Sequence, residues 1–241
     1  MSSPENIIRG SKLNPVPWKT FDVVIGVVTL VVLGLLLILV VGQVVGGDSD
    51  LGTESGVGLA LAGGISGVIK LHISWLIGPA RYRVPLSSLG LKPPVPQSPA
   101  QLLLPVLVLI ASLTFTGIYS VVVSALGWDV PQTLPEGLDG EGPVVIGLIA
   151  VIVVLLVPLA EEVFFRGFML SCLVGSLGTV GAAIVSSLVF AFFHIDPKIM
   201  LPIFVTGLLF AWLYNRTGSV WSCSAAHAMQ NALALSITIG N

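Results

Sequence analysis

Charged residues are scarce in this sequence, since Asp, Glu, Lys and Arg together make up only 9% of its 241 residues. Soluble globular domains usually carry about 25% charged residues. Because 55% of the residues are hydrophobic, the chain could not cover its surface with polar groups, which excludes an ordinary soluble domain. Neither end of the sequence carries a dense cluster of basic residues and no nucleic-acid-binding motif is present, so we expect no nucleic-acid partner. The expected surroundings are a lipid bilayer.

Cysteine is nearly absent as well, with Cys172 and Cys223 as the only two thiols. Both lie in apolar stretches, where a thiol usually serves as a small core residue, so we predict no disulfide between them. The first apolar run, 21–45, is longer than the roughly 7–15 residues of a signal-peptide core. We therefore expect this run to be retained as a membrane helix.

Several apolar segments have the length of a membrane helix, which needs roughly 20 apolar residues to cross a bilayer. The last three candidates are short for complete crossings. The pattern predicts an all-α, polytopic transmembrane bundle of about seven membrane helices. The candidate spans are 21–45, 57–77, 101–126, 143–166, 178–194, 199–214 and 219–239.

The predicted segments between the helices alternate in charge. The tail 1–20 and the proline-rich loop 78–100 carry an excess of Lys and Arg, whereas 46–56 and 127–142 carry acidic residues and no basic ones. Basic loops stay on the cytoplasmic side of a membrane. We therefore expect a cytoplasmic N-terminus in a multi-pass protein of the cell inner membrane. Residues 21–126 would supply three N-terminal helices, followed by a four-helix core at 143–239.

The second span combines small residues with two basic ones. Its glycines, Gly58, Gly63, Gly64 and Gly67, suit close packing of helices in a membrane. Lys70 and His72 follow near the predicted cytoplasmic end of the span. We expect both side chains to extend toward water along their aliphatic or ring stems.

Polar residues that a bilayer tolerates poorly gather in three groups in the second half of the chain. A spacing of four residues places the members of each group on one face of a helix. Glu162 precedes Arg166 in the order that favours a helical ion pair, while Glu161 is rotated about 100° away from Glu162 and can face a cavity. The groups are Glu161, Glu162 and Arg166; Phe190 and His194; His227 and Asn231.

These groups are predicted to meet at one depth. With turns near Ser176 and Gly218 and a rise of 1.5 Å per residue, Glu161 and His194 lie about 22 and 27 Å from the first turn, and His227 about 15 Å from the second. They can share a cavity within the membrane that opens toward the cytoplasm. A carboxylate and a histidine on facing helices can polarise a water, and a histidine with an asparagine can stabilise an oxyanion.

Three motifs carry a family resemblance. Glu-Glu-x-x-x-Arg at 161–166, Phe-x-x-x-His at 190–194 and His-x-x-x-Asn at 227–231 occur in this order on apolar helices. This set resembles that of the CPBP family of intramembrane proteases, which includes the CAAX prenyl proteases of the Rce1 type and the Abi or bacteriocin-immunity proteins. The resemblance covers roughly residues 143–235.

The resemblance implies a glutamate-dependent intramembrane endopeptidase with a catalytic core at 143–239. Glu161 and His194 would activate water, and His227 and Asn231 would form the oxyanion site. Substrates would be membrane-anchored peptides or proteins, or CAAX-like tails. The supporting residues would be Glu162, Arg166 and Phe190.

Other interpretations remain open. Glu162 with Arg166 alone could be a structural ion pair, and His227 with Asn231 could only join helices by hydrogen bonds. No cofactor is required, but a zinc ion needs three or four ligands, and Glu161, His194 and His227 could supply three. A non-proteolytic immunity or scaffold protein would be expected to have a broken motif set. A transporter would be expected to have inverted repeats and charges at several depths.

Overall fold

The computed structural model describes residues 13, 15–45, 56–94, 99–128, 142–194 and 196–240, and every secondary-structure element within them is helical. The acidic segments 46–56 and 127–142 and the tail 1–20 lie largely outside the described residues. The elements are α2 (Thr20–Val45), α3 (Gly56–Trp75), η1 (Leu76–Ala80), η2 (Leu86–Leu89), α4 (Pro99–Leu102), α5 (Leu104–Ala125), α6 (Pro143–Ala150), η3 (Val151–Leu156), α7 (Val157–Glu162), η4 (Val163–Leu170), α8 (Ser171–Phe192), α9 (Pro197–Thr217) and α10 (Val220–Gly240).

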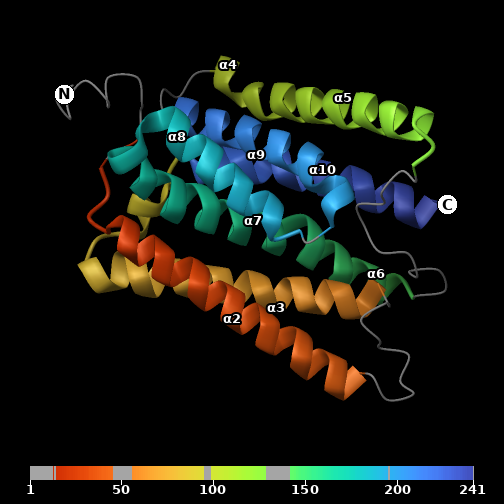
Figure 1. Cartoon of the computed structure of the whole chain (residues 1–241), viewed down its shortest axis with the longest axis horizontal. Coiled ribbons are helices and arrows are strands. Elements are labelled where there is room, and N and C mark those ends of the chain that lie inside the picture. The colour runs from red at the N-terminus through yellow and green to blue at the C-terminus, as the bar shows by residue number, and fades with distance from the viewer. Residues whose placement is uncertain are drawn as a thin grey trace.

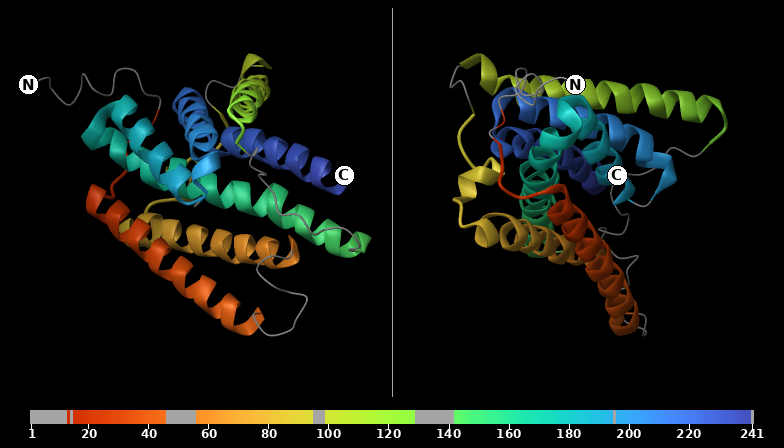
Figure 2. Two further views of the ribbon diagram at one scale, coloured as in Figure 1. Left: turned by 45° about the vertical axis from the view of Figure 1, so that its right-hand side comes forward. Right: turned by 60° about the vertical axis from the view of Figure 1, so that its left-hand side comes forward.

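The long helices pack side by side in one bundle (Figure 1). Helix α3 contacts α2 on one side and α7 on the other, and α9 and α10 both contact α5. In the views of Figure 2, α2 and α5 lie at opposite edges of the bundle, with the helices of the second half of the chain between α3 and α5. The residues of the three motifs therefore occupy the middle of the bundle.

Five segments are long and apolar enough to cross a membrane. This finding supports a multi-pass, all-α membrane protein, as predicted, although the predicted number of seven crossings is not confirmed. Helix α10, which corresponds to the predicted span 219–239, is not among the five segments. The five are Thr20–Val40, Ala60–Ala80, Leu104–Ala125, Pro143–Phe192 and Pro197–Thr217.

The segment Pro143–Phe192 contains two helices rather than one. The first runs from α6 through η4 into the start of α8, well beyond the end of the predicted span 143–166. It ends at Gly178, whose φ of 69° and ψ of 173° break the helical path. Glycine adopts a positive φ without the steric penalty of a Cβ, so the chain reverses there. The turn lies two residues from the predicted position at Ser176.

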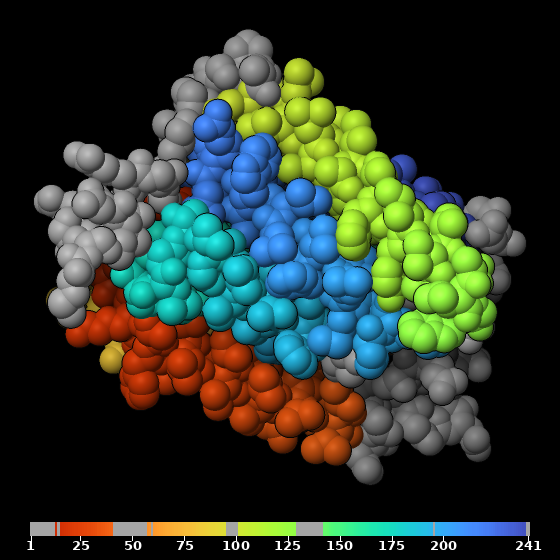
Figure 3. Space-filling model, turned by 45° about the horizontal axis from the view of Figure 1, so that its top comes forward, coloured from red at the N-terminus to blue at the C-terminus, as the bar shows by residue number. Residues whose placement is uncertain are grey.

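Apolar side chains are exposed along the outer helices. Leu35 on α2 is 58% exposed and Val121 on α5 is 70% exposed. Figure 3 shows α2, α8, α9 and α5 side by side on one face of the molecule. Such surfaces would be unfavourable in water, whereas a helix in lipid presents them to acyl chains.

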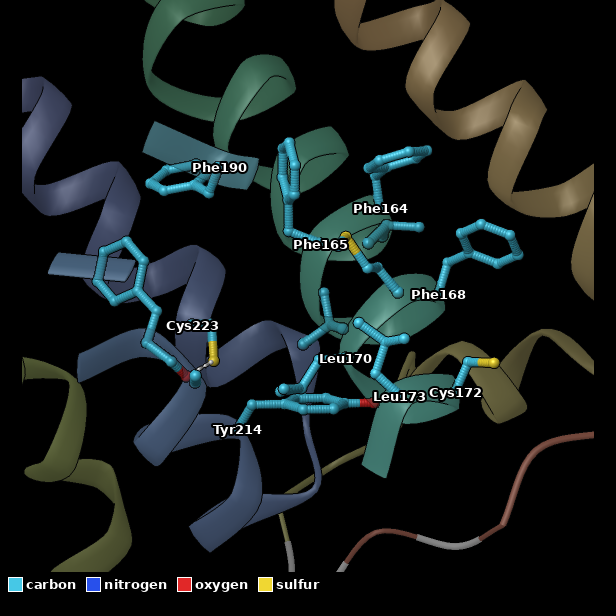
Figure 4. Packing of buried hydrophobic residues seen from close by; sticks show 14 of the residues in the cluster. Phe164, Phe165, Phe168, Leu170, Cys172, Leu173, Phe190, Tyr214 and Cys223 are labelled. Atoms are coloured by element: carbon cyan, nitrogen blue, oxygen red, sulfur yellow. Dashed lines mark hydrogen bonds between the residues drawn. The ribbon is translucent and has the colours of Figure 1, made fainter. Parts of the chain in front are cut away.

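Aromatic side chains fill the centre of the bundle. Phe164, Phe165 and Phe168 extend from η4, and Phe165 meets Phe190 of α8 edge to face at 5.1 Å between ring centroids (Figure 4). All four rings are buried. The two cysteines, on different helices in this region, are free and buried. Phe190 of this aromatic cluster also contacts Arg166, His194 and His227.

Candidate active site

The adjacent glutamates lie between two π-helical turns, η3 and η4. At the end of η3, the Val157 N–H bonds to the carbonyl of Ile152, five residues back. Pro158 has no N–H to donate. The Val153 carbonyl therefore lacks its helical donors, and the Asn231 side-chain amide of α10 donates to it at 2.9 Å. The proline thus explains both the local π geometry and the position of Asn231.

The second π turn follows the glutamates directly. At its end, the Ser171 N–H bonds to the Arg166 carbonyl, and the Ser171 hydroxyl donates to the same oxygen at 3.1 Å. Gly167 lies so close to the backbone of Leu89 that a Cβ would be 2.3 Å from the Leu89 carbonyl oxygen. Turns of this kind often occur at functional sites because they change the direction of neighbouring side chains.

Glu162 is fully buried and held by two donors. Arg166 and His227 Nδ1 each lie 3.1 Å from Glu162 Oε1. The guanidinium of Arg166 also donates to the Gly207 carbonyl at 3.2 Å and lies 4.5 Å from the centre of the Phe190 ring. The predicted ion pair between Glu162 and Arg166 is therefore present, and it connects α7 to α8, α9 and α10.

Glu161 faces a different set of partners from Glu162. Its Oε1 accepts a hydrogen bond from Lys70 Nζ at 2.9 Å, and its Oε2 lies 4.0 Å from His227 Nε2. His194 lies near enough to interact electrostatically with this carboxylate. The side chain of Glu161 is 10% exposed, whereas that of Glu162 is not exposed at all. Of the two carboxylates, only Glu161 retains some access to its surroundings.

The prediction for Lys70 is wrong. Its side chain does not extend toward water but is buried, with 6% exposed, against Glu161. The sequence could not identify this partner, which lies on another helix 91 residues away. The predicted span 57–77 contains Lys70 but no Asp or Glu. Because buried charges in membranes usually have a partner, this pattern could have indicated a partner on another helix. His72 is exposed, and its Nδ1 lies 2.9 Å from the Val68 carbonyl.

The two histidines of the motifs share one arrangement. His194 Nδ1 lies 3.0 Å from the Phe190 carbonyl oxygen, and His227 Nδ1 faces the Glu162 carboxylate. Both oxygens are acceptors, so each Nδ1 carries a proton, and a ring in its neutral form would then have a free lone pair on Nε2. Phe190 lies between them, with ring centroids 4.9 Å from His194 and 6.0 Å from His227.

Asn231 lies one helical turn beyond His227, on the same helix. Its side chain is partly buried and donates to Val153, and in the described part of the chain it makes no hydrogen bond to Glu161, His194 or His227. The structure therefore brings the acidic and histidine motifs into direct contact through Glu162 and His227. Asn231 instead donates a hydrogen bond to Val153 of η3, which belongs to the same long helix as Glu162.

The predicted metal ligands Glu161, His194 and His227 lie on α7, just after the end of α8 and on α10, respectively. Within the described ranges, no three His, Cys, Asp or Glu side chains are grouped so that they could hold one ion. The Lys70 ammonium already binds one oxygen of Glu161. In this arrangement the three side chains do not fit a metal site.

Comparisons with known proteins agree with the geometry. Residues 143–233 match the family described as "Type II CAAX prenyl endopeptidase Rce1-like". A protein of Bacillus subtilis (strain 168) with the name "Putative membrane peptidase YdiL" is 35% identical over 74 residues, which are 31% of this chain and 30% of that protein. The chain thus matches less than a third of the length of this curated relative. No solved structure matches the chain.

Fold and site together define a multi-pass, all-α membrane protein with a buried polar cluster inside its helical bundle. The matched segment contains all three polar motifs, from Glu161 to Asn231. The predicted resemblance is therefore confirmed over residues 143–233, which match the Rce1-like family.

Proposed function

We propose that this protein is an intramembrane endopeptidase in which Glu161 activates a water molecule to attack a peptide carbonyl. The observation that supports this proposal is the difference between the two glutamates in burial and in bonding partners. Glu162 is fully buried and bound by Arg166 and His227, whereas Glu161 directs Oε2 toward His227 Nε2 at 4.0 Å. This separation is too long for a hydrogen bond, so His227 leaves Oε2 available to accept one from a water molecule.

In the proposed reaction, the water donates one hydrogen bond to Glu161 and one to the bare Nε2 of His194. Glu161 takes a proton as the water oxygen bonds to the substrate carbonyl carbon, which produces a tetrahedral oxyanion. The same carboxyl group then gives the proton to the leaving amine as the C–N bond breaks. His194 would orient the water, in keeping with its proton on Nδ1.

His227 and Asn231 are the proposed donors to the oxyanion. Because His227 Nδ1 donates to Glu162, its Nε2 can donate only when the ring is protonated, and the Glu162 carboxylate would stabilise that charge. Asn231 uses one amide hydrogen for Val153 and retains a second. Phe190 would support the site by separating the two histidines and covering Arg166.

The family match supports membrane-anchored peptides or CAAX-like tails as substrates. Arg81, Arg83 and Lys92 lie together in the segment that follows α3, and basic segments favour the cytoplasmic side. We therefore propose that this end of the bundle, and the N-terminus with it, faces the cytoplasm of a bacterial-type inner membrane. The site would then receive substrates that are anchored in the same bilayer.

The proposal is tested with the full chain in liposomes and two internally quenched peptides, one with a farnesylated CAAX end and one with an unmodified transmembrane segment. Mass spectrometry identifies the cleaved bond. We expect cleavage by the wild type and none by Glu161→Gln. The preferred peptide defines the substrate class. Activity that a chelator abolishes and zinc restores would contradict the metal-free mechanism, and absence of cleavage of either peptide would favour a non-proteolytic immunity or scaffold role.

A further inference from the structure

Helix α3 approaches η3 and α7 closely along a face of small residues. A Cβ at Gly67 would be 3.4 Å from the Cβ of Ala160, and one at Gly64 would be 3.1 Å from a methyl group of Ile152. A Cβ at Gly63 would be 3.5 Å from Val157. The absence of side chains at these positions lets the two backbones come together in the membrane.

Lys70 is the next residue on this face, three positions after Gly67. On the facing helix, Glu161 directly follows Ala160, the residue opposite Gly67. The Lys70 ammonium donates a hydrogen bond to Glu161 Oε1 at 2.9 Å. Both side chains are largely buried. Helix α3 itself has no Asp or Glu, so the partner of this lysine comes from outside its own helix.

We propose that Lys70 is a positioning residue of the catalytic centre and that the glycine face of α3 brings it there. This inference rests on the proposed role of Glu161. By holding Oε1, Lys70 turns the other oxygen, Oε2, toward His227. It also supplies the positive charge that offsets a carboxylate removed from water.

A purely structural role accounts for the pair less well. The same part of the long helix is already connected to its neighbours by Glu162, Arg166 and His227. A buried ion pair adds little net stability, because desolvation of both charges offsets their attraction. In contrast, two cations beside two carboxylates leave a site whose formal charges are balanced before substrate binds.

Lys70 lies outside the matched family segment, which begins at residue 143. The N-terminal helices are therefore part of the active centre in this chain, and not only a membrane anchor for the core. The glycines that carried no function in the sequence acquire one through the residue that they position.

The test uses Lys70→Met, Lys70→Arg and Gly67→Val, with whichever of the two quenched peptides the wild type cleaves as substrate and kcat expressed per folded molecule. Misplacement of a reacting group by about 1 Å can cost roughly 100-fold in rate, so we expect Lys70→Met to lower kcat by about that factor. KM should stay within about threefold, because Lys70 does not bind the substrate. Lys70→Arg should recover most of the rate because it retains the charge.

Gly67→Val provides a second route to the same effect, since its side chain would push α3 and Lys70 away from α7. Gly34→Val is the matched control, because a Cβ at Gly34 on α2 would meet nothing within 4 Å. We expect a reduced kcat for the first variant and an unchanged kcat for the second. If Lys70→Met does not fold, the comparison of Lys70→Arg, Gly67→Val and Gly34→Val decides the question.

Glu161→Gln in the same assay separates the two proposals. If Glu161→Gln is inactive while folded Lys70→Met has the kcat of the wild type, only the Lys70 inference is overturned. If Glu161→Gln keeps the kcat of the wild type, the water-activating role fails and the Lys70 inference fails with it. Loss of kcat in both, with rescue by Lys70→Arg, is the predicted result.

Discussion

His227 Nδ1 and Arg166 meet at one oxygen of Glu162, each at 3.1 Å. This shared contact joins α10 to the long helix in the centre of the bundle. It also determines which nitrogen of His227 faces Glu161. The stability of the fold and the chemistry of the proposed site therefore depend on the same buried carboxylate.

Loss of Arg166 is expected to destabilise the fold. Arg166→Met leaves the Glu162 carboxylate buried without its cation, which should lower the free energy of unfolding by about 3–5 kcal/mol. Unfolding by denaturant in detergent micelles measures the change. Arg81→Met is the control, because Arg81 is 58% exposed, 3.6 Å from Asp22, and Tyr82 still donates a hydrogen bond to Asp22 when Arg81 is lost. We expect this variant to lose about 1 kcal/mol at most. Equal losses in the two variants would contradict the buried role of Arg166.

The hydrogen bond between Asn231 and Val153 makes a prediction about Pro158. Asn231→Ala leaves the Val153 carbonyl without a donor, at a cost of about 1–3 kcal/mol in the free energy of unfolding. Pro158→Ala restores a backbone N–H that can take over this role. We expect the Asn231→Ala loss to be smaller in the Pro158→Ala background. Additive losses in the double variant would show that the π turn does not depend on the proline.

The protonation pattern of the histidines can be measured directly. The chain contains three histidines, and the Nδ1 of each lies within 3.1 Å of an oxygen acceptor. Nuclear magnetic resonance of ¹⁵N-histidine-labelled protein should therefore detect the Nδ1–H form for each neutral ring. A neutral His227 with its proton on Nε2 is incompatible with the hydrogen bond to Glu162. Glu162→Leu is the matched variant, in which His227 alone should lose the preference.

The approach of α3 to α7 predicts a disulfide. A Cβ at position 67 would lie 3.4 Å from the Cβ of Ala160, near the range of roughly 3.5–4.5 Å seen across disulfides. Gly67→Cys with Ala160→Cys should cross-link under mild oxidation, in a chain whose native Cys172 and Cys223 are replaced by alanine. Thiol alkylation and mass spectrometry follow the bond. The pair Gly34→Cys and Ala160→Cys should stay reduced, and failure of the first pair to cross-link would contradict the packing.

Much of the local structure follows from the sequence. The spacing of Glu162 and Arg166 predicted their ion pair, and the small residues near 176 and at Gly218 predicted both turns. Gly218 ends α9 with a φ of 64°, a conformation that glycine adopts readily. These features depend on residues a few positions apart, so a single sequence is sufficient to predict them.

Other features depend on residues that are far apart. The bond between Lys70 and Glu161 needs the register of α3 against α7, which the glycine pattern suggests but does not determine. The bond between Asn231 and Val153 needs the π turn before Pro158. The number of crossings also stayed open, because 143–192 is one continuous apolar stretch and α10 is comparatively polar. Such features follow from packing between helices rather than from local pattern.

The central claim is that the Glu161 carboxylate activates the attacking water. The most direct measurement is the kcat of Glu161→Gln on the peptide that the wild type cleaves, at equal amounts of folded protein. The substitution keeps the shape of the side chain but removes its capacity to accept a proton. We expect kcat to fall by at least about 100-fold, as is typical for loss of a general base. A Glu161→Gln variant that cleaves at the rate of the wild type would contradict the claim.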